Sequence, residues 1–297
     1  MRTAENWREY ELIDTSSGER LERWGRYILI RPDPQIIWQS EKKDPLWKNA
    51  HARYERSSKG GGSWTVYKQL PQEWQVAYDF KNDLRPFNKL SFKVKPMGFK
   101  HTGIFPEQAV NWDWMRDKIL ASAEERPVRV LNLFAYTGGA TLACLSAGAN
   151  VCHVDASKGM VQWAKENARL CGLPQERQRW IVDDCMKFIA RERRRESYYD
   201  AIIMDPPSYG RGPSGEVWQL EDQIYGLVES AAGILSEKPL FFIINSYTTG
   251  LSPSVMKYIM ELALGGRGGK ASADEIGLPV SSTGLTLPCG ATAIYEF

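Results

Sequence analysis

Residues 127–157 restrict the possible folds of this 297-residue chain more than any other stretch. They begin with a short apolar run, Val128–Leu133, which is typical of a buried strand. A turn follows at Tyr136–Gly139, and Ala140–Ala147 has the composition of a helix. A second apolar run then ends at Asp155. The pattern predicts strand, tight loop, helix and strand, which is the repeating unit of parallel α/β sheets.

The loop of this unit suits a nucleoside cofactor. Gly138 and Gly139 let the backbone approach a ligand, and the helix behind them points unpaired N–H groups toward it. Asp155 follows about twenty residues after the turn, where a carboxylate can accept hydrogen bonds from both ribose hydroxyls. The alternative is that Asp155 caps the next helix. We favour the ribose because the complete unit is present and not the acid alone.

The loop lacks the Gly-x-Gly-x-x-Gly pattern of dinucleotide binders. Phe134 and Tyr136 occupy the places of its early glycines, so a pyrophosphate would find little bare backbone. S-adenosylmethionine has no phosphate, and its methionine end needs only a few polar groups near the loop. The loop therefore favours a methyltransferase over a dehydrogenase.

From residue 97 onward the chain alternates strands with helices. The predicted strands are Val128–Leu133, Val151–Asp155, Arg179–Val182, Ala201–Met204 and Leu240–Asn245, followed by a closing pair at Ile276–Val280 and Ala291–Phe297. The predicted helices are Glu107–Ala123, Ala140–Ala147, Lys158–Leu170, Met186–Arg194, Gln219–Leu235 and Val255–Leu264. We expect an α/β domain over residues 97–297, a doubly wound, Rossmann-like sheet of seven strands whose last strand is antiparallel.

Residues 1–96 alternate polar and apolar positions and predict a small β-rich domain. Its expected strands are Tyr10–Asp14, Trp24–Ile30, Trp64–Tyr67, Trp74–Tyr78 and Leu90–Lys95. Ser16–Gly18 is predicted to be a hairpin turn, and Arg31–Pro34 ends the first pair of strands because proline lacks an N–H donor. One short helix is expected within Lys42–Lys59, and Lys59–Ser63 is expected to be a flexible break.

Charge is distributed unevenly along the chain, although the formal net charge is only +2. Residues 1–100 contain 19 Lys and Arg against 13 Asp and Glu, a net of +6, and residues 101–297 contain 19 against 23, a net of −4. The basic part also holds six of the eleven tryptophans. Basic residues interleaved with aromatic ones suit a polyanion with stackable bases. The alternative, left open here, is a tryptophan-rich β core with a solvated face.

The five cysteines are too scattered for a C-x-x-C pair and too few for a disulfide scaffold. They are Cys144, Cys152, Cys171, Cys185 and Cys289. The first residues lack the apolar core of a signal peptide, and no stretch reaches the length of a membrane span. We therefore expect a cytoplasmic protein with buried thiols, no membrane partner and no metal.

Polar residues follow every strand of the expected sheet. They are Asn132 and Gly138, Asp155, Asp183 and Asp184, Asp205–Tyr209, and Asn245–Tyr247. Ligands of open α/β sheets bind at the carboxyl ends of the strands. Chemistry is therefore expected along this edge.

Asp205-Pro206-Pro207 is the most specific of these motifs. Two prolines in succession extend the backbone and have no N–H groups, so their carbonyls can accept from an amino group. Such acceptors would align the nitrogen lone pair with a sulfonium methyl carbon, and in-line transfer gains mainly from positioning. The alternative for the motif by itself is a structural turn.

Asn132–Gly139, with sequence NLFAYTGG, and Asp205–Tyr209, with sequence DPPSY, carry a resemblance to a known family. From about residue 100 onward the chain resembles class I S-adenosylmethionine-dependent methyltransferases, in particular the bacterial group related to 23S ribosomal RNA methyltransferases. The resemblance implies that Asn132–Gly139 wraps the methionine moiety, Asp155 holds the ribose and Asp184 takes the adenine amino group. His101–Gln108 resembles the lead-in to the cofactor cleft, although Pro106-Glu107 replaces the more usual Leu-Asp.

The residues assigned by motif and resemblance fall into two groups. The cofactor-binding residues are Thr102, Phe105, Gln108, Asn132, Phe134, Ala135, Tyr136, Thr137, Gly138, Gly139, Asp155, Ala156, Ser157, Asp183, Asp184 and Asp205. The catalytic residues are Asp205, Pro206, Pro207 and Tyr209, of which Tyr209 would stack on a flipped base. Asp183 and Asp184 compete for adenine, because neighbouring side chains at a strand end point to opposite sides. Asp184 is preferred by its place before the next helix.

The sequence argues against methylation of carbon 5 of a pyrimidine, which requires a thiolate that adds to the ring. Family members of that kind carry the cysteine beside Asp-Pro-Pro or just after the fifth strand. Here Ser208-Tyr209 and Asn245–Tyr247 occupy those places, and Cys185 and Cys289 are expected to be structural. Transfer to nitrogen or oxygen, with nitrogen preferred, is favoured.

The expected function is therefore methylation of a base in ribosomal or other structured RNA, as a step of ribosomal RNA processing. Ribosomal RNA relatives often carry an RNA-binding module ahead of the small β-rich domain, and residues 1–96 have room only for the latter. Arg191–Arg195 is either an RNA contact or a solvated helix face. The alternatives are a methyltransferase of a protein or small molecule and a non-catalytic RNA-binding protein of the same fold. A homo-oligomer is left open.

Overall fold

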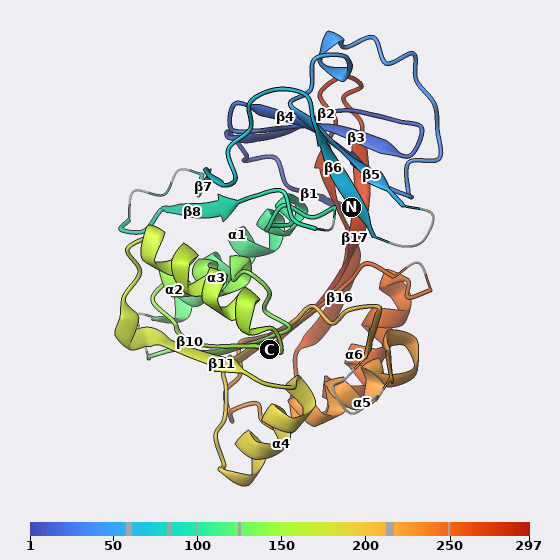
Figure 1. The fold of residues 1–297 in the computed structure, drawn as a ribbon. Coiled ribbons are helices and arrows are strands. Elements are labelled where there is room, and N and C mark those ends of the chain that lie inside the picture. Colours follow the sequence, from blue (N-terminus) through green and yellow to red (C-terminus); the bar gives the residue numbers. More distant parts are fainter. Residues whose placement is uncertain are drawn as a thin grey trace. The chain divides into compact units, whose positions relative to one another are not determined.

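The computed structural model describes residues 1–57, 61–81, 83, 85–98, 100–123, 126–211, 217–248 and 250–297. The chain forms two compact units (Figure 1). The methyltransferase-like unit comprises residues 1–2, 111–276 and 290–297, and the N-terminal unit comprises residues 3–110 and 277–289. The N-terminal unit thus continues past residue 96 and includes the tip of the closing hairpin. A functional division into domains of residues 1–96 and 97–297 stays a prediction.

The main sheet contains eight strands in the order β1-β16-β17-β15-β12-β9-β10-β11. Their bounds are β1 Arg2–Thr3, β9 Arg129–Leu133, β10 Asn150–Asp155, β11 Gln178–Val182, β12 Ala201–Met204, β15 Phe241–Ser246, β16 Lys270–Pro279 and β17 Thr286–Glu296. Strand β9 is parallel to β10 and β12, β12 is parallel to β15, and β17 is antiparallel to β15. These pairings confirm the Rossmann-like sheet with an antiparallel last strand. The two-residue strand β1 is an addition to the seven that were predicted.

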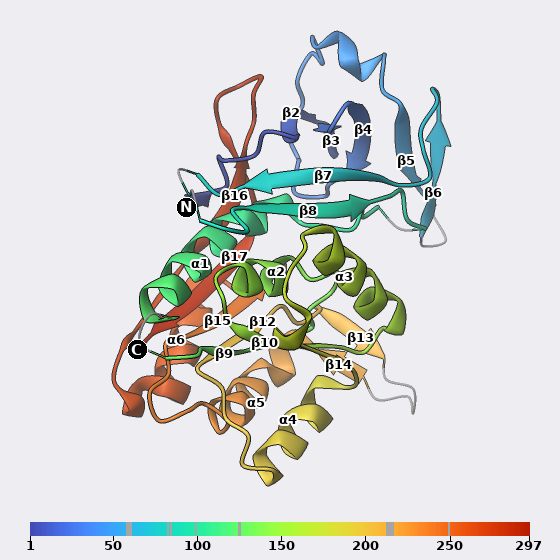
Figure 2. The same cartoon turned by 90° about the vertical axis from the view of Figure 1, so that its left-hand side faces the viewer.

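Helices cover both faces of this sheet. They are α1 Ala109–Ala123, α2 Gly139–Ser146, α3 Lys158–Leu170, α4 Cys185–Arg194, α5 Leu220–Ala232 and α6 Pro253–Leu264. Figure 2 shows α1, α2 and α3 on one face and α4, α5 and α6 on the other. The core beneath α4–α6 joins Phe188, Leu227 and Met260 to Leu131 and Ile202 of the strands, all nearly or fully buried. All the predicted helices are confirmed, with small shifts at their ends. Short 3-10 helices lie at Pro106–Gln108, Gln175–Arg177 and Gly265–Arg267.

Strand order places a topological switch point between β9 and β12. The chain runs from β9 through β10 to β11 toward one edge, and then returns to β12 on the other side of β9. At such a point the connections leave in opposite directions, so the carboxyl ends of the two strands open onto a crevice. The loop after Leu133 and the motif that begins at Asp205 both follow these two strands.

The N-terminal unit contains a five-stranded sheet in the order β2-β3-β4-β5-β6 and a two-stranded ribbon, β7-β8. The bounds are β2 Tyr10–Ser16, β3 Glu19–Trp24, β4 Tyr27–Pro32, β5 Ala52–Arg56, β6 Gly62–Val66, β7 Trp74–Asp79 and β8 Lys89–Val94, with a 3-10 helix at Pro45–Trp47. The predicted turn at Ser16–Gly18, the short helix and strands β6, β7 and β8 are confirmed. A small core of Ile13, Leu21, Ile28 and Ile30 lies in the first sheet.

Three expectations for this unit need correction. The strand predicted at Trp24–Ile30 is divided, because the chain turns at Gly25, whose φ is +63°, so Trp24 ends β3 and Tyr27 begins β4. Strand β5 and all of β3 except Trp24 were not predicted. The expected break at Lys59–Ser63 lies partly outside the described residues, but its end is ordered, since Gly62 begins β6. A Cβ atom at Gly62 would lie 2.2 Å from the Glu55 carbonyl oxygen, so close pairing with β5 explains this glycine.

A further hairpin also escaped prediction in the methyltransferase-like unit. Strands β13 (Tyr209–Arg211) and β14 (Val217–Gln219) pair in antiparallel fashion directly after the Asp-Pro-Pro motif.

Among the helices of the described residues, none is both long and apolar enough to cross a membrane.

Candidate functional site

The loop between β9 and α2 has an unusual backbone. Phe134 and Tyr136 have φ values of +54° and +50°, and Gly138 has +92°. The Ala135 N–H donates to the Val154 carbonyl of β10 at 3.1 Å. Left-handed backbone at a non-glycine residue costs of order 1–3 kcal/mol and persists only where the surroundings enforce it, commonly at ligand sites. Two such residues in one short loop at the switch point support a binding function for it.

Asp155 holds this loop from the end of the next strand. The Tyr136 N–H donates to its Oδ2 at 2.9 Å, and the Ser157 N–H donates to its Oδ1 at 2.8 Å. Partial burial raises the pKa of the carboxyl group, an effect that these two hydrogen bonds oppose. The helix cap of α3 is Ser157, which accepts from the Met160 N–H at 3.4 Å. Asp155 is therefore not the N-cap, and each of its oxygens keeps a second lone pair for a ligand hydroxyl.

Gly138 and Gly139 are required by packing inside the unit. A Cβ atom at Gly138 would lie 3.0 Å from Cβ of Ala164 in α3. At Gly139 it would lie 2.6 Å from Cζ2 of Trp112 in α1. The start of α2 thus lies too close to α1 for a side chain at Gly139, while at Gly138 a side chain would be crowded by α3 and strained by the φ of +92°. This gives the two glycines a cause apart from close approach to a ligand, which stays a prediction.

Asn132 belongs to a buried hydrogen-bond chain that links β9, α2 and β10. It is 3% exposed, and its Nδ2 donates to Oγ1 of Thr141 at 2.9 Å. The same Thr141 oxygen lies 2.9 Å from Nδ1 of His153. Burial lowers the pKa of His153 to about 3, so its imidazole is neutral. The structure gives the Asn132 side chain this internal function, and its contact with the cofactor stays a prediction. Thr137 is also buried, and its carbonyl accepts from Asn167 at 2.9 Å.

The two acidic residues after β11 have different partners. Asp184 is exposed and caps α4, accepting from the Lys187 N–H at 2.9 Å. Asp183 forms an ion pair with Arg191 and accepts from the Asp184 N–H at 2.9 Å. The Asp183 N–H donates to the Asp155 carbonyl at 3.1 Å, which joins this strand end to that of β10. The ion pair compensates the charge of Asp183, which favours Asp184 for adenine.

The Asp-Pro-Pro motif follows β12 and is covered by the unexpected hairpin. The Trp218 indole donates to the Pro207 carbonyl at 2.6 Å, and the Trp218 ring lies 6.0 Å from that of Phe134 between centroids. The Pro207 carbonyl, which was expected to accept from an amino group, thus already receives one donor and keeps a second lone pair. Its contact with an amino group stays a prediction. Asp205 is half-buried, and Pro206 is buried.

Sequence reasoning missed Trp218 and Thr248 at this edge. The Thr248 hydroxyl donates to Oγ of Ser208, and the Leu220 N–H donates to the Ser208 carbonyl at 3.1 Å. Tyr209, expected to stack on a base, is 53% exposed. An aromatic residue in an otherwise polar segment was the only available signal for Trp218. The ends of β9 and β12 are joined by the Asp205 N–H, which donates to the Leu133 carbonyl at 3.4 Å, and those of β9 and β10 by the Ala135 N–H on the Val154 carbonyl.

Burial disfavours the thiolate form of four of the five cysteines. Cys144, Cys152, Cys185 and Cys289 are buried, Cys171 is half-buried, and all five are free. Burial raises the pKa of Cys152 to about 11 and that of Cys185 to about 12. At neutral pH these groups are protonated and weakly nucleophilic. The described residues also contain no cluster of His, Cys, Asp and Glu that could hold a metal ion.

Thr102, Phe105 and Gln108 belong to the N-terminal unit. Thr102 is fully buried, and among the described residues its hydroxyl has no hydrogen-bond partner. Gln108 is 8% exposed, and its N–H donates to the Phe105 carbonyl at 3.1 Å. Glu107 is buried, and burial raises the pKa of its carboxyl group. Their contact with the cofactor stays a prediction.

Comparison with known proteins gives this arrangement a family. Residues 73–224, about half of the chain, match the family described as S-adenosylmethionine-dependent methyltransferase. The match begins at the ribbon of the N-terminal unit and runs past Asp205-Pro-Pro. It covers the three strand ends described above.

Individual relatives and a solved structure agree with this match. The ribosomal RNA large subunit methyltransferase K/L of Magnetococcus marinus is 34% identical over 160 residues, covering 52% of this chain and 21% of that protein. The ribosomal RNA large subunit methyltransferase I of Photobacterium profundum is 33% identical over 129 residues, covering 43% and 31%. The chain thus spans a third or less of these relatives. The crystal structure of an S-adenosylmethionine-dependent methyltransferase from Agrobacterium tumefaciens matches with a TM-score of 0.90 and 36% identity, covering 99% of this chain and 92% of that one.

Proposed function

Since the chain belongs to the family of S-adenosylmethionine-dependent methyltransferases, we propose that it methylates a nitrogen of a base in ribosomal or other structured RNA. Methyl transfer from S-adenosylmethionine follows from the family. The RNA substrate is inferred from the relatives named as ribosomal RNA methyltransferases. Such a substrate would place the protein in the cytoplasm and in ribosomal RNA processing.

One observation carries the preference for nitrogen. Asp205-Pro206-Pro207 follows β12 at the switch point. Ser208 comes directly after this motif, and its hydroxyl is hydrogen-bonded to that of Thr248, which follows β15. A carbon-5 enzyme would need a thiolate at this place. The thiol nearest to this edge in sequence is Cys185, whose pKa is raised to about 12. Transfer to nitrogen requires no covalent adduct with the enzyme, so this edge suffices for it.

The loop and the acidic strand ends would hold the cofactor. Asp155 would accept both ribose hydroxyls with the lone pairs that Tyr136 and Ser157 leave unused. The adenine amino group would donate to Asp184, which is exposed and outside the ion pair of Asp183. Phe134–Gly139 would surround the methionine moiety.

The motif after β12 would position the acceptor base. Bound S-adenosylmethionine supplies an electrophilic methyl group on a sulfonium sulfur. The Asp205 carboxylate and the Pro206 carbonyl would accept hydrogen bonds from the base amino group, which points its lone pair at the methyl carbon. As the N–C bond forms, the C–S bond breaks and its electron pair stays on sulfur. The proton lost from nitrogen would pass to Asp205 or to water. Tyr209, exposed on β13, would stack on the base.

The decisive experiment compares ribosomal RNA from cells with and without the gene by mass spectrometric mapping. Loss of one methylated base, restored when purified protein and S-adenosylmethionine are added to the unmodified RNA, is the expected result. Unchanged RNA, together with methylation of a protein or small molecule in the same lysate, would contradict the proposed substrate. Hydrolysis of the product nucleoside then distinguishes N-methyl from C-methyl bases.

A further inference from the structure

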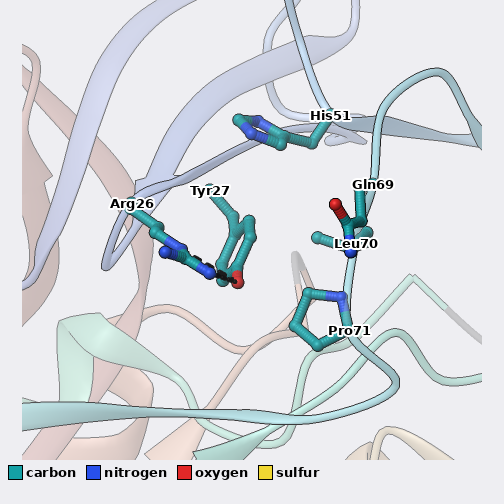
Figure 3. A pocket seen from close by; sticks show the side chains of 6 residues that line it. All are labelled: Arg26, Tyr27, His51, Gln69, Leu70 and Pro71. Atoms are coloured by element: carbon teal, nitrogen blue, oxygen red, sulfur yellow. Dashed lines mark hydrogen bonds between the residues drawn. The ribbon is translucent and has the colours of Figure 1, made fainter.

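A pocket of about 400 Å³ lies entirely within the N-terminal unit. Its walls come from three parts of the chain: the turn between β3 and β4, the residue before β5, and the segment between β6 and β7. The lining residues are Arg26, Tyr27, His51, Gln69, Leu70 and Pro71. Figure 3 shows Arg26 and Tyr27 on one side, Gln69, Leu70 and Pro71 on the other, and His51 between them at the top of the view. The volume lies in the range of small-ligand sites, roughly 300–1,000 Å³.

The walls offer hydrogen-bond donors and no carboxylate. Nδ1 of His51 accepts from the Ile28 N–H at 3.0 Å, so the neutral ring carries its proton on Nε2, which is a donor. Nε and Nη2 of Arg26 donate to the Tyr27 hydroxyl oxygen at 3.0 and 2.8 Å. That uses two of the five guanidinium N–H groups and holds the guanidinium beside the Tyr27 hydroxyl. The remaining N–H groups have no acceptor among the described residues.

The charges around the pocket are positive. Burial lowers the pKa of His51, and the charged side chains that lower it further are Lys68 and Arg26. Both are exposed. Lys68 also donates to the Asn49 carbonyl at 2.7 Å, which holds its ammonium group near this part of the unit. A site whose lining holds donors and one cation but no acidic residue, with the cation Lys68 next to the lining residue Gln69 in the chain, selects an anionic ligand that is rich in acceptors.

Tyr27, Leu70 and Pro71 supply the apolar part of the lining. Tyr27 is buried, and its ring meets His51 edge-on at 5.3 Å and Trp74 at 4.9 Å between centroids. These contacts keep the aromatic wall rigid. Leu70 and Pro71 face it across the pocket. A planar ring can enter between such walls, and the amide of Gln69 can pair with either donors or acceptors on its edge.

We propose that this pocket binds one unpaired nucleotide of an RNA, its phosphate on Arg26 and Lys68 and its base between the Tyr27–His51 wall and Pro71. The inference rests on the proposed RNA substrate and adds a second contact with it outside the methyl-transfer site. An acidic peptide would satisfy the cations but not the rigid walls. A duplex is too wide for a pocket of this size, so single-stranded segments next to structured regions are the expected ligands.

The test measures binding of a fluorescent ten-nucleotide single-stranded RNA to the full chain by anisotropy at several salt concentrations. Arg26→Ala and His51→Asn are the variants. Asn can keep the acceptor for the Ile28 N–H while it removes the Nε2 donor, so local folding is preserved. Arg8→Ala, which removes an exposed cation of the same unit outside the pocket, is the matched control. Calorimetry with S-adenosylmethionine checks that each variant keeps its cofactor site.

We expect Arg26→Ala to weaken RNA binding about tenfold and to reduce the slope of log K against log salt by about one. His51→Asn should weaken RNA binding severalfold and leave the salt slope unchanged. Arg8→Ala should change the affinity for RNA less than twofold. Equal affinity of all variants for RNA would overturn the proposed nucleotide site but not the proposed RNA methylation. The same holds if polyglutamate competes with the labelled RNA as well as unlabelled RNA does. A wild-type protein that binds cofactor but neither binds nor methylates RNA overturns both proposals.

Discussion

The backbone N–H of Tyr136 lies 2.9 Å from Oδ2 of Asp155 and joins the loop after β9 to the end of β10. Tyr136 has a positive φ, which a non-glycine residue adopts only when other contacts hold it. Asp155 supplies such a contact, and it is also the residue proposed to bind ribose. The carboxylate therefore has two functions, one toward the loop and one toward the cofactor, that a single substitution would remove together.

Asp155→Ala is expected to lower the affinity for S-adenosylmethionine by at least about tenfold. Loss of a hydrogen bond to a charged group is worth roughly 1.5–3 kcal/mol. Asp155→Asn is the control, because its amide oxygen can keep one backbone N–H bond while the charge is lost, and an intermediate affinity is expected. Titration calorimetry measures both variants, and an unchanged dissociation constant for Asp155→Ala would refute the ribose assignment.

Asp205 should separate chemistry from cofactor binding. We expect Asp205→Ala to lower the turnover number by about 100-fold or more, since acid–base and positioning groups typically contribute that much. The affinity for S-adenosylmethionine should stay within about tenfold. Asp205→Asn, which keeps an acceptor oxygen for the base amino group, should retain more activity than the alanine variant. Single-turnover rates together with calorimetry measure the two effects, and normal turnover of Asp205→Ala would make the motif a structural turn.

The two glycines Gly139 and Gly226 are predicted to respond in opposite directions to alanine. A Cβ atom at Gly139 would lie 2.6 Å from the Trp112 ring, so Gly139→Ala should lower the free energy of unfolding by about 1–3 kcal/mol. Gly226 lies exposed within α5 with nothing within 4 Å of an added Cβ, so Gly226→Ala should raise it by about 0.5–1 kcal/mol. Denaturant titrations compare the two, and equal effects would contradict the packing argument.

Sequence patterns predicted the elements around the cofactor loop because each strand there is a short apolar run bounded by turn residues. They failed where an apolar run conceals a turn. Trp24 and Tyr27 both look like strand residues, and only the φ of Gly25 separates β3 from β4. Strand β5 was missed because its pattern is short and lies among polar residues.

Contacts between distant segments also could not be predicted from the sequence. The choice of acidic residues and the Asp-Pro-Pro motif followed from their places after strands. The hydrogen bond from the Trp218 indole to the Pro207 carbonyl depends on the hairpin of β13 and β14, which no local sequence pattern predicted. Likewise, the closeness of Trp112 to Gly139 comes from the packing of α1 against α2. Sequence therefore located the candidate site, while the partners of its backbone groups required the structure.

His153 should make the stability of the protein depend on pH in the mildly acidic range. Its pKa in the folded state is lowered to about 3, against about 6.5 in an unfolded chain. As the pH falls below about 6.5, the unfolded state binds a proton that the folded state excludes. The free energy of unfolding should therefore fall by up to about 1.4 kcal/mol per pH unit between about pH 6 and pH 3. Above pH 7 this contribution is constant.

The measurement compares wild type with His153→Gln by denaturant titration at several pH values between 4.5 and 7. Other titrating groups, including His101 of the N-terminal unit, contribute equally to both proteins. The free energy of unfolding should fall more steeply with decreasing pH in the wild type than in the variant. Should the variant fail to fold, an NMR titration of the His153 ring in the wild type serves instead. A ring that becomes protonated near pH 6 would show that its burial does not act as argued.

Transfer to nitrogen, as proposed, predicts that the cysteines are dispensable for turnover. Ser208 and Thr248 hydrogen-bond each other at the edge where a nucleophile would be needed, and Cys185, beside the helix cap Asp184, is buried with its pKa raised to about 12. Cys185→Ala should cost stability through lost packing, yet the folded protein should keep its rate of methyl transfer within a few fold. Cys171→Ala, at a half-buried position, is the matched control and should change neither. A folded Cys185→Ala variant that binds cofactor but is inert, or an RNA containing 5-fluoropyrimidine that becomes covalently trapped on the wild type, would instead make Cys185 a nucleophile and carbon 5 the site of methylation.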